Sequence, residues 1–255
     1  MAASQGMAAI RRRAFGALLA AVALAWAFPA SAQLQPAVDA PVSWPPAPPV
    51  LVAQHQRAFA GLAARIDSQL PDVQSVAVVH RGHLAFEFYR AGVTASTLQD
   101  TQSVTKSVLA LLFGQAQADG FVRGPQELVA LRLPQLLRVG ADARVQKLRF
   151  EHLLTMTAGW PGEETAQRNR DDDLGWIARR PLLADPGTRF AYDNGAANLL
   201  AMALANAVNQ PLSAYARQRL FEPLGIHRFE WRQGGAGHDL GALGLSLSTR
   251  GMARL

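Results

Sequence analysis

The chain of 255 residues contains no cysteine, and it holds only two lysines and three tyrosines. Without cysteine there can be no disulfide, no thiolate nucleophile and no cysteine-ligated metal. Charged residues are also few, at 17% against 49% hydrophobic residues, so the composition fits one large or two small globular domains rather than a disordered chain. Because Lys106 and Lys147 stand against a large excess of arginine, a lysine at a fixed spacing from another reactive group is informative.

The first 32 residues are typical of a secretory signal peptide. Arg11–Arg13 form a positive segment, Ala14–Phe28 form an apolar segment, and Ala30–Ala32 supplies a small-x-small cleavage site before Gln33. An uncleaved membrane anchor is the alternative, but the apolar segment is shorter than the roughly 20 residues that a span needs. The sequence therefore predicts cleavage after Ala32 and export to a periplasm or to the outside, with membrane contact only during export.

Removal of that segment lowers the formal net charge from +6 to about +3, and the remaining positive charges are scattered. Nucleic-acid binding would favour a basic stripe with aromatic platforms, so we expect no nucleic-acid partner. Nothing in the sequence indicates an oligomeric state.

The rest of the chain divides into a proline-rich linker, residues 33–50, and a domain, residues 51–255. The patterns predict a helix over Gln54–Leu70 and a hairpin formed by Ser75–His80 and Leu84–Tyr89. No further strand is expected, and helical patterns follow to the end of the chain. These predicted helices are Ser103–Ala118, Phe150–Thr157, Leu174–Arg180, Ala196–Asn209 and Leu212–Phe221.

The last ten residues, Ser246–Leu255, are typical of an N-cap followed by a new helix, and the sequence ends within that pattern. A hairpin of two strands also does not make an independently stable sheet. We therefore expect the domain to be C-terminally incomplete, with further sheet strands missing.

Ser103 and Lys106 form a Ser-x-x-Lys element at the start of a strongly apolar helical run. A spacing of three places both side chains on one face of a helix, where the amine can hold the proton of the hydroxyl. The alternative is a serine that caps the helix beside a surface lysine. The pair therefore predicts a nucleophile only if partners occur elsewhere in the chain.

Tyr192 and Asn194 supply such partners, because they form a Tyr-x-Asn element in a glycine-flanked turn before a helix. With these two elements the chain resembles the serine β-lactamase and penicillin-binding superfamily, most closely its branch of class C β-lactamases, esterases and D-stereospecific peptidases. Three further segments are similar to that family: Glu151–Gly159, Phe221–Gly225 and Gly244–Thr249. The alternative for the element itself is a turn asparagine beside a core tyrosine.

The resemblance implies an α/β fold of the β-lactamase/transpeptidase type, with an antiparallel sheet flanked by helices and a mainly helical region at about 110–235. It implies that Ser103 is the nucleophile and that Asn194 binds a substrate amide. Either Lys106 or Tyr192 is then the base in acylation, and the two side chains are expected to act as a coupled pair. The Ser103 backbone N–H would stabilise the oxyanion. The family's third element, Lys or His followed by Ser/Thr and Gly on a late strand, is absent from this sequence.

The resemblance therefore implies acyl transfer without a cofactor. An esterase or amidase acting on small acyl compounds is the first reading, a β-lactamase or D-alanyl carboxypeptidase acting on cell-wall peptides is the second, and a catalytically inactive family member is the third. Other candidates have simpler interpretations. His80, His83 and His238 lack metal-ligand spacing, so we expect no metal. Asp171–Asp173 suit a solvated loop, His152 suits a cap or packing role, and core packing is at least as favoured as a cleft lining for Trp160, Trp176 and Trp231.

Overall fold

The computed structural model describes residues 42–137, 142–162 and 174–255, all of which belong to one unit, Pro36–Leu255. The predicted signal peptide, the first part of the proline-rich linker and the acidic run Asp171–Asp173 lie outside the described residues. Within the described part of the chain, no helix is both long enough and apolar enough to cross a membrane.

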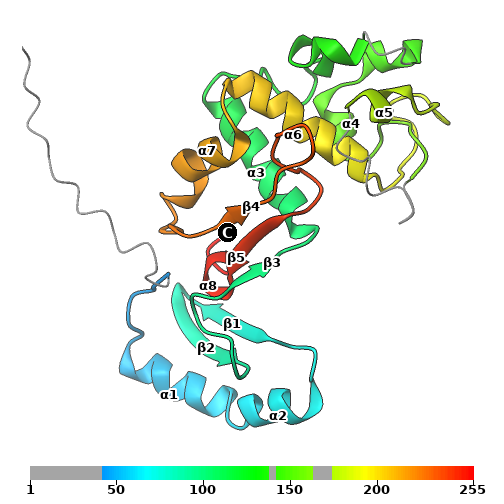
Figure 1. Cartoon of the computed structure of the whole chain (residues 1–255). Coiled ribbons are helices and arrows are strands. Elements are labelled where there is room, and N and C mark those ends of the chain that lie inside the picture. Colours follow the sequence, from blue (N-terminus) through cyan, green and yellow to red (C-terminus); the bar gives the residue numbers. More distant parts are fainter. Residues whose placement is uncertain (1–41, 138–141, 163–173) are drawn as a thin grey trace, which may run out of the picture. The chain divides into compact units, whose positions relative to one another are not determined.

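Along the chain two helices precede three strands, a long run of helices follows, and two short strands and a last helix come at the end (Figure 1). The first half contains α1 (Pro49–Ala58), α2 (Leu62–Gln69), β1 (Ser75–His80), β2 (His83–Tyr89), β3 (Leu98–Asp100), α3 (Val104–Ala118), η1 (Val129–Leu131), η2 (Pro134–Leu137) and η3 (Ala143–Lys147). The second half contains α4 (Phe150–Leu154), α5 (Leu174–Arg179), α6 (Asn194–Val208), α7 (Leu212–Ala216), η5 (Arg217–Phe221), β4 (Glu230–Trp231), β5 (Leu245–Ser248) and α8 (Thr249–Met252).

The first helical segment is two helices and not the single helix predicted over 54–70. The chain breaks between α1 and α2 at Gly61, whose φ of 72° lies in the left-handed region that ends helices. The apolar pattern continues across this break, which is why periodicity missed it. The predicted β1–β2 hairpin is confirmed, and it is antiparallel. Phe59, between the two helices, stacks on Phe86 of β2 with ring centroids 5.2 Å apart.

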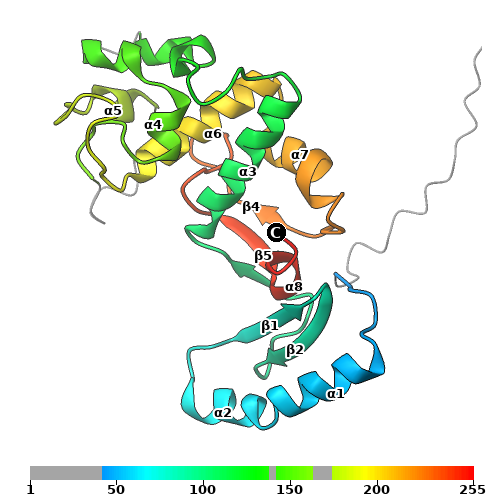
Figure 2. The same ribbon diagram turned by 180° about the vertical axis from the view of Figure 1, so that it is seen from behind.

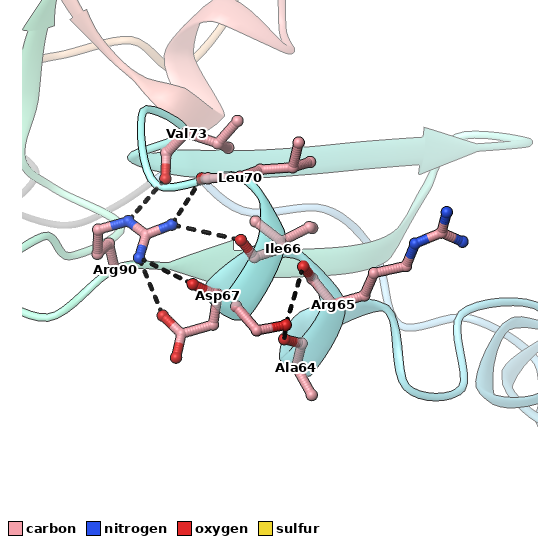
Figure 3. Close-up of polar contacts among 8 residues, drawn as sticks. Ala64, Arg65, Ile66, Asp67, Leu70, Val73 and Arg90 are labelled. Atoms are coloured by element: carbon pink, nitrogen blue, oxygen red, sulfur yellow. Dashed lines mark hydrogen bonds and ion pairs between the residues drawn. The ribbon is translucent and has the colours of Figure 1, made fainter.

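Arg90, directly after β2, ties the hairpin to the end of α2 (Figure 3). Its guanidinium donates to the carbonyl oxygens of Val73 and Leu70, at 2.9 Å and 2.8 Å, and to the Asp67 carboxylate at 3.0 Å. The last carbonyls of a helix have no partner inside the helix and carry partial negative charge. Arg90, which is partly buried, therefore caps α2 and fixes its place beside the hairpin.

A second sheet lies outside the sequence prediction, which expected no strand after the hairpin. It has the order β3-β5-β4, and both pairings are antiparallel. These strands are two to four residues long, so they are too short to show an alternating pattern. Their pairing partners are far apart in sequence, as for Leu98 and Ser248, and local propensity carries no signal of such contacts.

The core lies around α3 and α6, which pack against each other and are visible together from the front in Figure 1 and from behind in Figure 2. Helix α6 is buried along most of its length, whereas α3 buries only one face, with Leu109 and Leu112 among its buried residues. Both helices were predicted within two residues at each end. The predicted helix 212–221 is instead α7 followed by a π-helical turn, Arg217–Phe221.

The C-terminal segment forms the predicted capped helix. The Ser248 hydroxyl accepts a hydrogen bond from the Gly251 N–H at 3.0 Å and so caps α8. Arg250 of α8 then links the C-terminal helix to β2 and to the first described residue, because it pairs with Glu87 and donates to the Val42 carbonyl at 3.1 Å. Val42 is buried, so the proline-rich segment is packed against the domain at its first described residue.

Candidate active site

The turn that carries Ser103 is built from an unusual backbone conformation. Gln102 has a φ of 48°, in the left-handed region, between β3 and α3. The Asp100 carboxylate stabilises this conformation by accepting the Gln102 backbone N–H at 2.8 Å and its side-chain amide at 2.7 Å. Ser103 occupies the N-cap position of α3, but its hydroxyl makes no capping bond. The hydroxyl is therefore directed to other partners.

Those partners are the two predicted ones. Lys106 Nζ donates to Ser103 Oγ at 3.2 Å, and Ser103 Oγ lies 2.8 Å from the Tyr192 hydroxyl. Lys106 Nζ also lies 4.9 Å from the centre of the Tyr192 ring. The structure thus brings together three side chains from two distant segments, the start of α3 and the turn before α6. Hydroxyl, amine and phenol are within the reach that proton transfer requires.

The electrostatics favour an ionisable phenol at this point. Partial burial raises the pKa of Tyr192, but the Lys106 ammonium and the Ser103 hydroxyl outweigh burial and hold the pKa below the ordinary value. Tyr192 is nevertheless 45% exposed, so a substrate can reach it. Tyr89 and Tyr215 behave oppositely, since burial and a neighbouring carboxylate raise the pKa of each to about 12.

Lys106 has a further partner that the sequence did not indicate, the backbone carbonyl of Ala242. Lys106 Nζ donates to the Ala242 oxygen at 2.6 Å, so the ammonium is held between this carbonyl and Ser103 Oγ. The Lys106 side chain is only partly buried. Every residue has a backbone carbonyl, so no sequence motif can indicate this contact, and only the structure reveals it.

Asp193, between Tyr192 and Asn194, is the second residue that sequence reasoning missed. It is buried, it caps α6 by accepting the Gly195 N–H at 2.9 Å, and it pairs with both terminal nitrogens of Arg180. The Arg180 guanidinium lies 5.2 Å from the ring centre of Trp160 and 5.1 Å from that of Trp176. Trp160 and Trp176 therefore help to hold Arg180, which in turn supports the Tyr192–Asn194 turn. Trp231 packs against the core.

Asn194 is the first residue of α6 and is partly buried. Among the described residues it has no side-chain hydrogen bond, and none links it to Lys106. It follows Tyr192 by two positions, so its amide is close in sequence to the reacting groups and remains available to a substrate.

The Ser103 backbone N–H is a candidate oxyanion donor. No acceptor among the described residues bonds to it, and it stands at the start of the fifteen-residue helix α3. The positive end of a helix dipole favours negative charge at this place. His152, by contrast, is confirmed as a capping residue, because its Nδ1 accepts the Arg149 N–H at 3.2 Å.

Comparison with known proteins agrees with this geometry. A family model described as beta-lactamase matches residues 51–250, and the chain belongs to that family. The resemblance expected from the sequence is thereby confirmed. A search of curated proteins gave no match.

Solved structures with the same fold include enzymes of several kinds. A class C beta-lactamase is 18% identical, with a TM-score of 0.64, and the match covers 80% of this chain and 64% of that one. A provisionally named 6-aminohexanoate-dimer hydrolase from Bacillus anthracis is 18% identical, with a TM-score of 0.63, and the match covers 74% and 55%. The hydrolase EstCE1, which has promiscuous acyltransferase activity, is 17% identical, with a TM-score of 0.60, and the match covers 80% and 71%.

These matches confirm the α/β fold of the β-lactamase/transpeptidase type. The chain spans less than two thirds of the length of the first two structures. At these identities the likeness concerns the fold, and the reaction and substrate are inferred from the site.

Proposed function

We propose that this protein is a serine hydrolase that works through an acyl-enzyme, with Ser103 as its nucleophile. The observation that carries the proposal is the hydrogen-bonded series Lys106 Nζ, Ser103 Oγ and Tyr192 OH, at 3.2 Å and 2.8 Å. A serine hydroxyl is a weak nucleophile until a neighbouring base takes its proton. Here two groups contact that hydroxyl, and one of them is a phenol with a lowered pKa.

In the proposed reaction the Ser103 hydroxyl loses its proton to the Lys106–Tyr192 pair while Oγ forms a bond to the substrate carbonyl carbon. The negative oxygen that results is stabilised by the Ser103 N–H at the start of α3. The bond to the leaving group then breaks, and the same pair returns the proton to the leaving alcohol or amine. Water repeats the sequence on the acyl-enzyme, frees the acid and restores the Ser103 hydroxyl. Lys106 and Tyr192 act as one coupled system, so the proton is assigned to the pair.

For the substrate we propose an ester or amide of a small acyl compound, with Asn194 donating to a substrate amide carbonyl. The open position of Tyr192, 45% exposed, supports a site that accepts varied leaving groups. A β-lactam or a D-alanyl cell-wall peptide is the second candidate, supported by the predicted export of the chain. The third possibility, a family member without turnover, is decided by the same assays.

A fluorophosphonate probe and a fluorescent penicillin separate these functions. Labelling by the fluorophosphonate alone is expected for an esterase or amidase, and labelling by both is expected for the cell-wall group. Ser103→Ala should abolish either label. Labelling that survives Ser103→Ala, or a folded protein that neither probe labels, contradicts the proposed function.

We also propose that the protein is exported after cleavage behind Ala32. The motif at residues 11–32 supports this proposal. Expression of the full chain followed by N-terminal sequencing of the protein outside the cytoplasm should give Gln33 as the first residue. Recovery of the intact N-terminus in the membrane fraction would instead support an anchor.

A further inference from the structure

We propose that Asn198 is a positioning residue for the active site and that it holds the Lys106 ammonium in place through the Gly241–Ala242 turn. This inference rests on the proposed function, since it assigns a support to the amine of that same site. Among the described residues, the hydrogen bonds of the Asn198 side-chain oxygen go to Gly241 and Ala242 and not to Ser103, Lys106 or Tyr192. It acts on Lys106 through two backbone groups.

Asn198 lies in α6 and is 2% exposed. Its side-chain oxygen accepts two hydrogen bonds, from the Gly241 N–H at 2.8 Å and from the Ala242 N–H at 3.0 Å. A single amide oxygen has two lone pairs, and both are used here on adjacent residues of one turn. Two successive N–H groups that converge on one fixed atom leave the turn little freedom to rotate.

Close packing adds to this restraint. A Cβ atom at Gly241 would lie 2.3 Å from the Ala197 carbonyl oxygen and 2.8 Å from the Ala201 Cβ, so the turn backbone lies directly on α6. Only glycine allows this approach. The Gly241–Ala242 turn is therefore fixed to the helix by contact as well as by hydrogen bonds.

The other side of the same segment is fixed to the turn and helix that carry the nucleophile. The Thr101 hydroxyl donates to the Leu245 carbonyl at 2.8 Å, and the Leu245 N–H donates to the Thr105 hydroxyl at 3.3 Å. Residues 241–245 thus connect α6, which follows Tyr192, with α3, which carries Lys106. Asn198 provides the anchor on the α6 side.

This arrangement fixes the position of the Ala242 carbonyl. It accepts Lys106 Nζ at 2.6 Å, which is shorter than the 3.2 Å from Nζ to Ser103 Oγ. A lysine side chain has four rotatable bonds and a compact charge, and a partly buried one without a fixed acceptor samples many positions. The carbonyl therefore selects the position from which Nζ reaches Ser103 Oγ.

The test compares Asn198→Ala with two reference variants. Asn198→Asp keeps an acceptor oxygen at the same distance from the backbone. Asn206→Ala removes another asparagine of α6, one whose side chain donates to the Arg132 carbonyl at 3.0 Å at the far end of the helix. All three are made in the full chain, and their unfolding midpoints are recorded so that acylation is compared only between folded proteins.

The first readout is the rate of Ser103 labelling by a fluorophosphonate. Asn198→Ala should slow labelling by roughly tenfold to a hundredfold, the size expected when a reacting group is displaced by about 1 Å. Asn198→Asp should recover most of the rate, and Asn206→Ala should leave it unchanged. Folded Asn198→Ala protein that is labelled at the wild-type rate overturns the proposal. If Asn198→Ala does not fold, Asn198→Ser, with one shorter acceptor, takes its place under the same criteria.

The second readout does not depend on turnover. The Lys106 ammonium is one of the groups that lower the pKa of Tyr192, so its displacement in Asn198→Ala should raise that pKa toward the ordinary value. A purely structural role for Asn198 would leave the Tyr192 titration as it is in the wild type, and this result contradicts the proposal. If the wild-type protein is not labelled at all, the proposed function fails, while the titration still decides whether Asn198 fixes Lys106.

Discussion

Arg180 and Asp193 form a two-pronged ion pair in the interior, with Arg180 Nη1 and Nη2 at 3.1 Å and 2.8 Å from the two carboxylate oxygens of Asp193. Both residues are at least nine-tenths buried. Asp193 stands between Tyr192 and Asn194, so the pair fixes the backbone from which both side chains of the Tyr-x-Asn element extend. The Tyr-x-Asn motif specifies Tyr192 and Asn194, whereas Asp193, its middle residue, is buried and holds their backbone in place.

The first prediction concerns this pair. Asp193→Ala should lower the free energy of unfolding by about 3–5 kcal/mol, because it removes the buried carboxylate that pairs with Arg180 and the cap of α6. Chemical denaturation measures the change. Asp67→Asn is the matched control, since Asp67 pairs with Arg90 at 3.0 Å but is 67% exposed and should contribute only about 0–1 kcal/mol. Equal losses in the two variants would contradict the buried support.

The second prediction is that the three tyrosines of the chain ionise in two separate steps. Tyr192 should ionise first, at a pH below the usual tyrosine value near 10, because the Lys106 ammonium and the Ser103 hydroxyl overcome the effect of burial on its pKa. Tyr89 and Tyr215 should follow near 12. The ultraviolet absorbance of tyrosinate follows both steps. Tyr192→Phe should remove only the early step, and a titration curve that keeps it would contradict the assignment.

Side-chain chemistry at fixed spacing was the part of the site that could be predicted from the sequence. Ser103 and Lys106 are in contact, and Tyr192 and Asn194 lie two positions apart at the start of α6. Both pairs could be predicted because each lies within one turn of a helix start. The contributions of Ala242 and Asn198 could not be predicted. Both depend on a turn that meets α6 through backbone groups, and no local residue pattern encodes that meeting.

The fold shows the same division. Helices α3 and α6 were predicted because their apolar residues recur over fifteen positions. The strands β3, β4 and β5 were missed because each is short and is stabilised by a partner distant in sequence, as Leu98 is by Ser248. The break at Gly61 was missed because a single left-handed residue leaves the apolar pattern on both sides intact.

The third prediction concerns the strained residue before the nucleophile. Gln102 has a φ of 48°, which costs a residue with a Cβ roughly 1–2 kcal/mol relative to glycine. Gln102→Gly should therefore raise the free energy of unfolding by up to about 1 kcal/mol, after allowance for the larger entropy of glycine in the unfolded chain and for the lost bond to Asp100. Asn209→Gly, at a φ of 53° at the end of α6, is the control and should gain less, since asparagine tolerates this region. A destabilised Gln102→Gly would show that the side-chain bond to Asp100 outweighs the strain.

The fourth prediction concerns pH and the contact between α1 and the hairpin. His55 Nε2 lies 3.0 Å from His80 Nδ1, and burial, His80 and His83 together lower the pKa of His55 below 6.5. Because the folded chain binds this proton less readily than the unfolded chain, the unfolded state holds more protons between the two pKa values. The contribution of neutral His55 to the free energy of unfolding is therefore complete above pH 6.5, and it is lost as the pH falls through the folded-state pKa of His55. Denaturation midpoints measured across this range should decrease with acid in the wild type and should decrease less in His55→Gln. An unchanged slope in His55→Gln would assign the acid sensitivity to other groups.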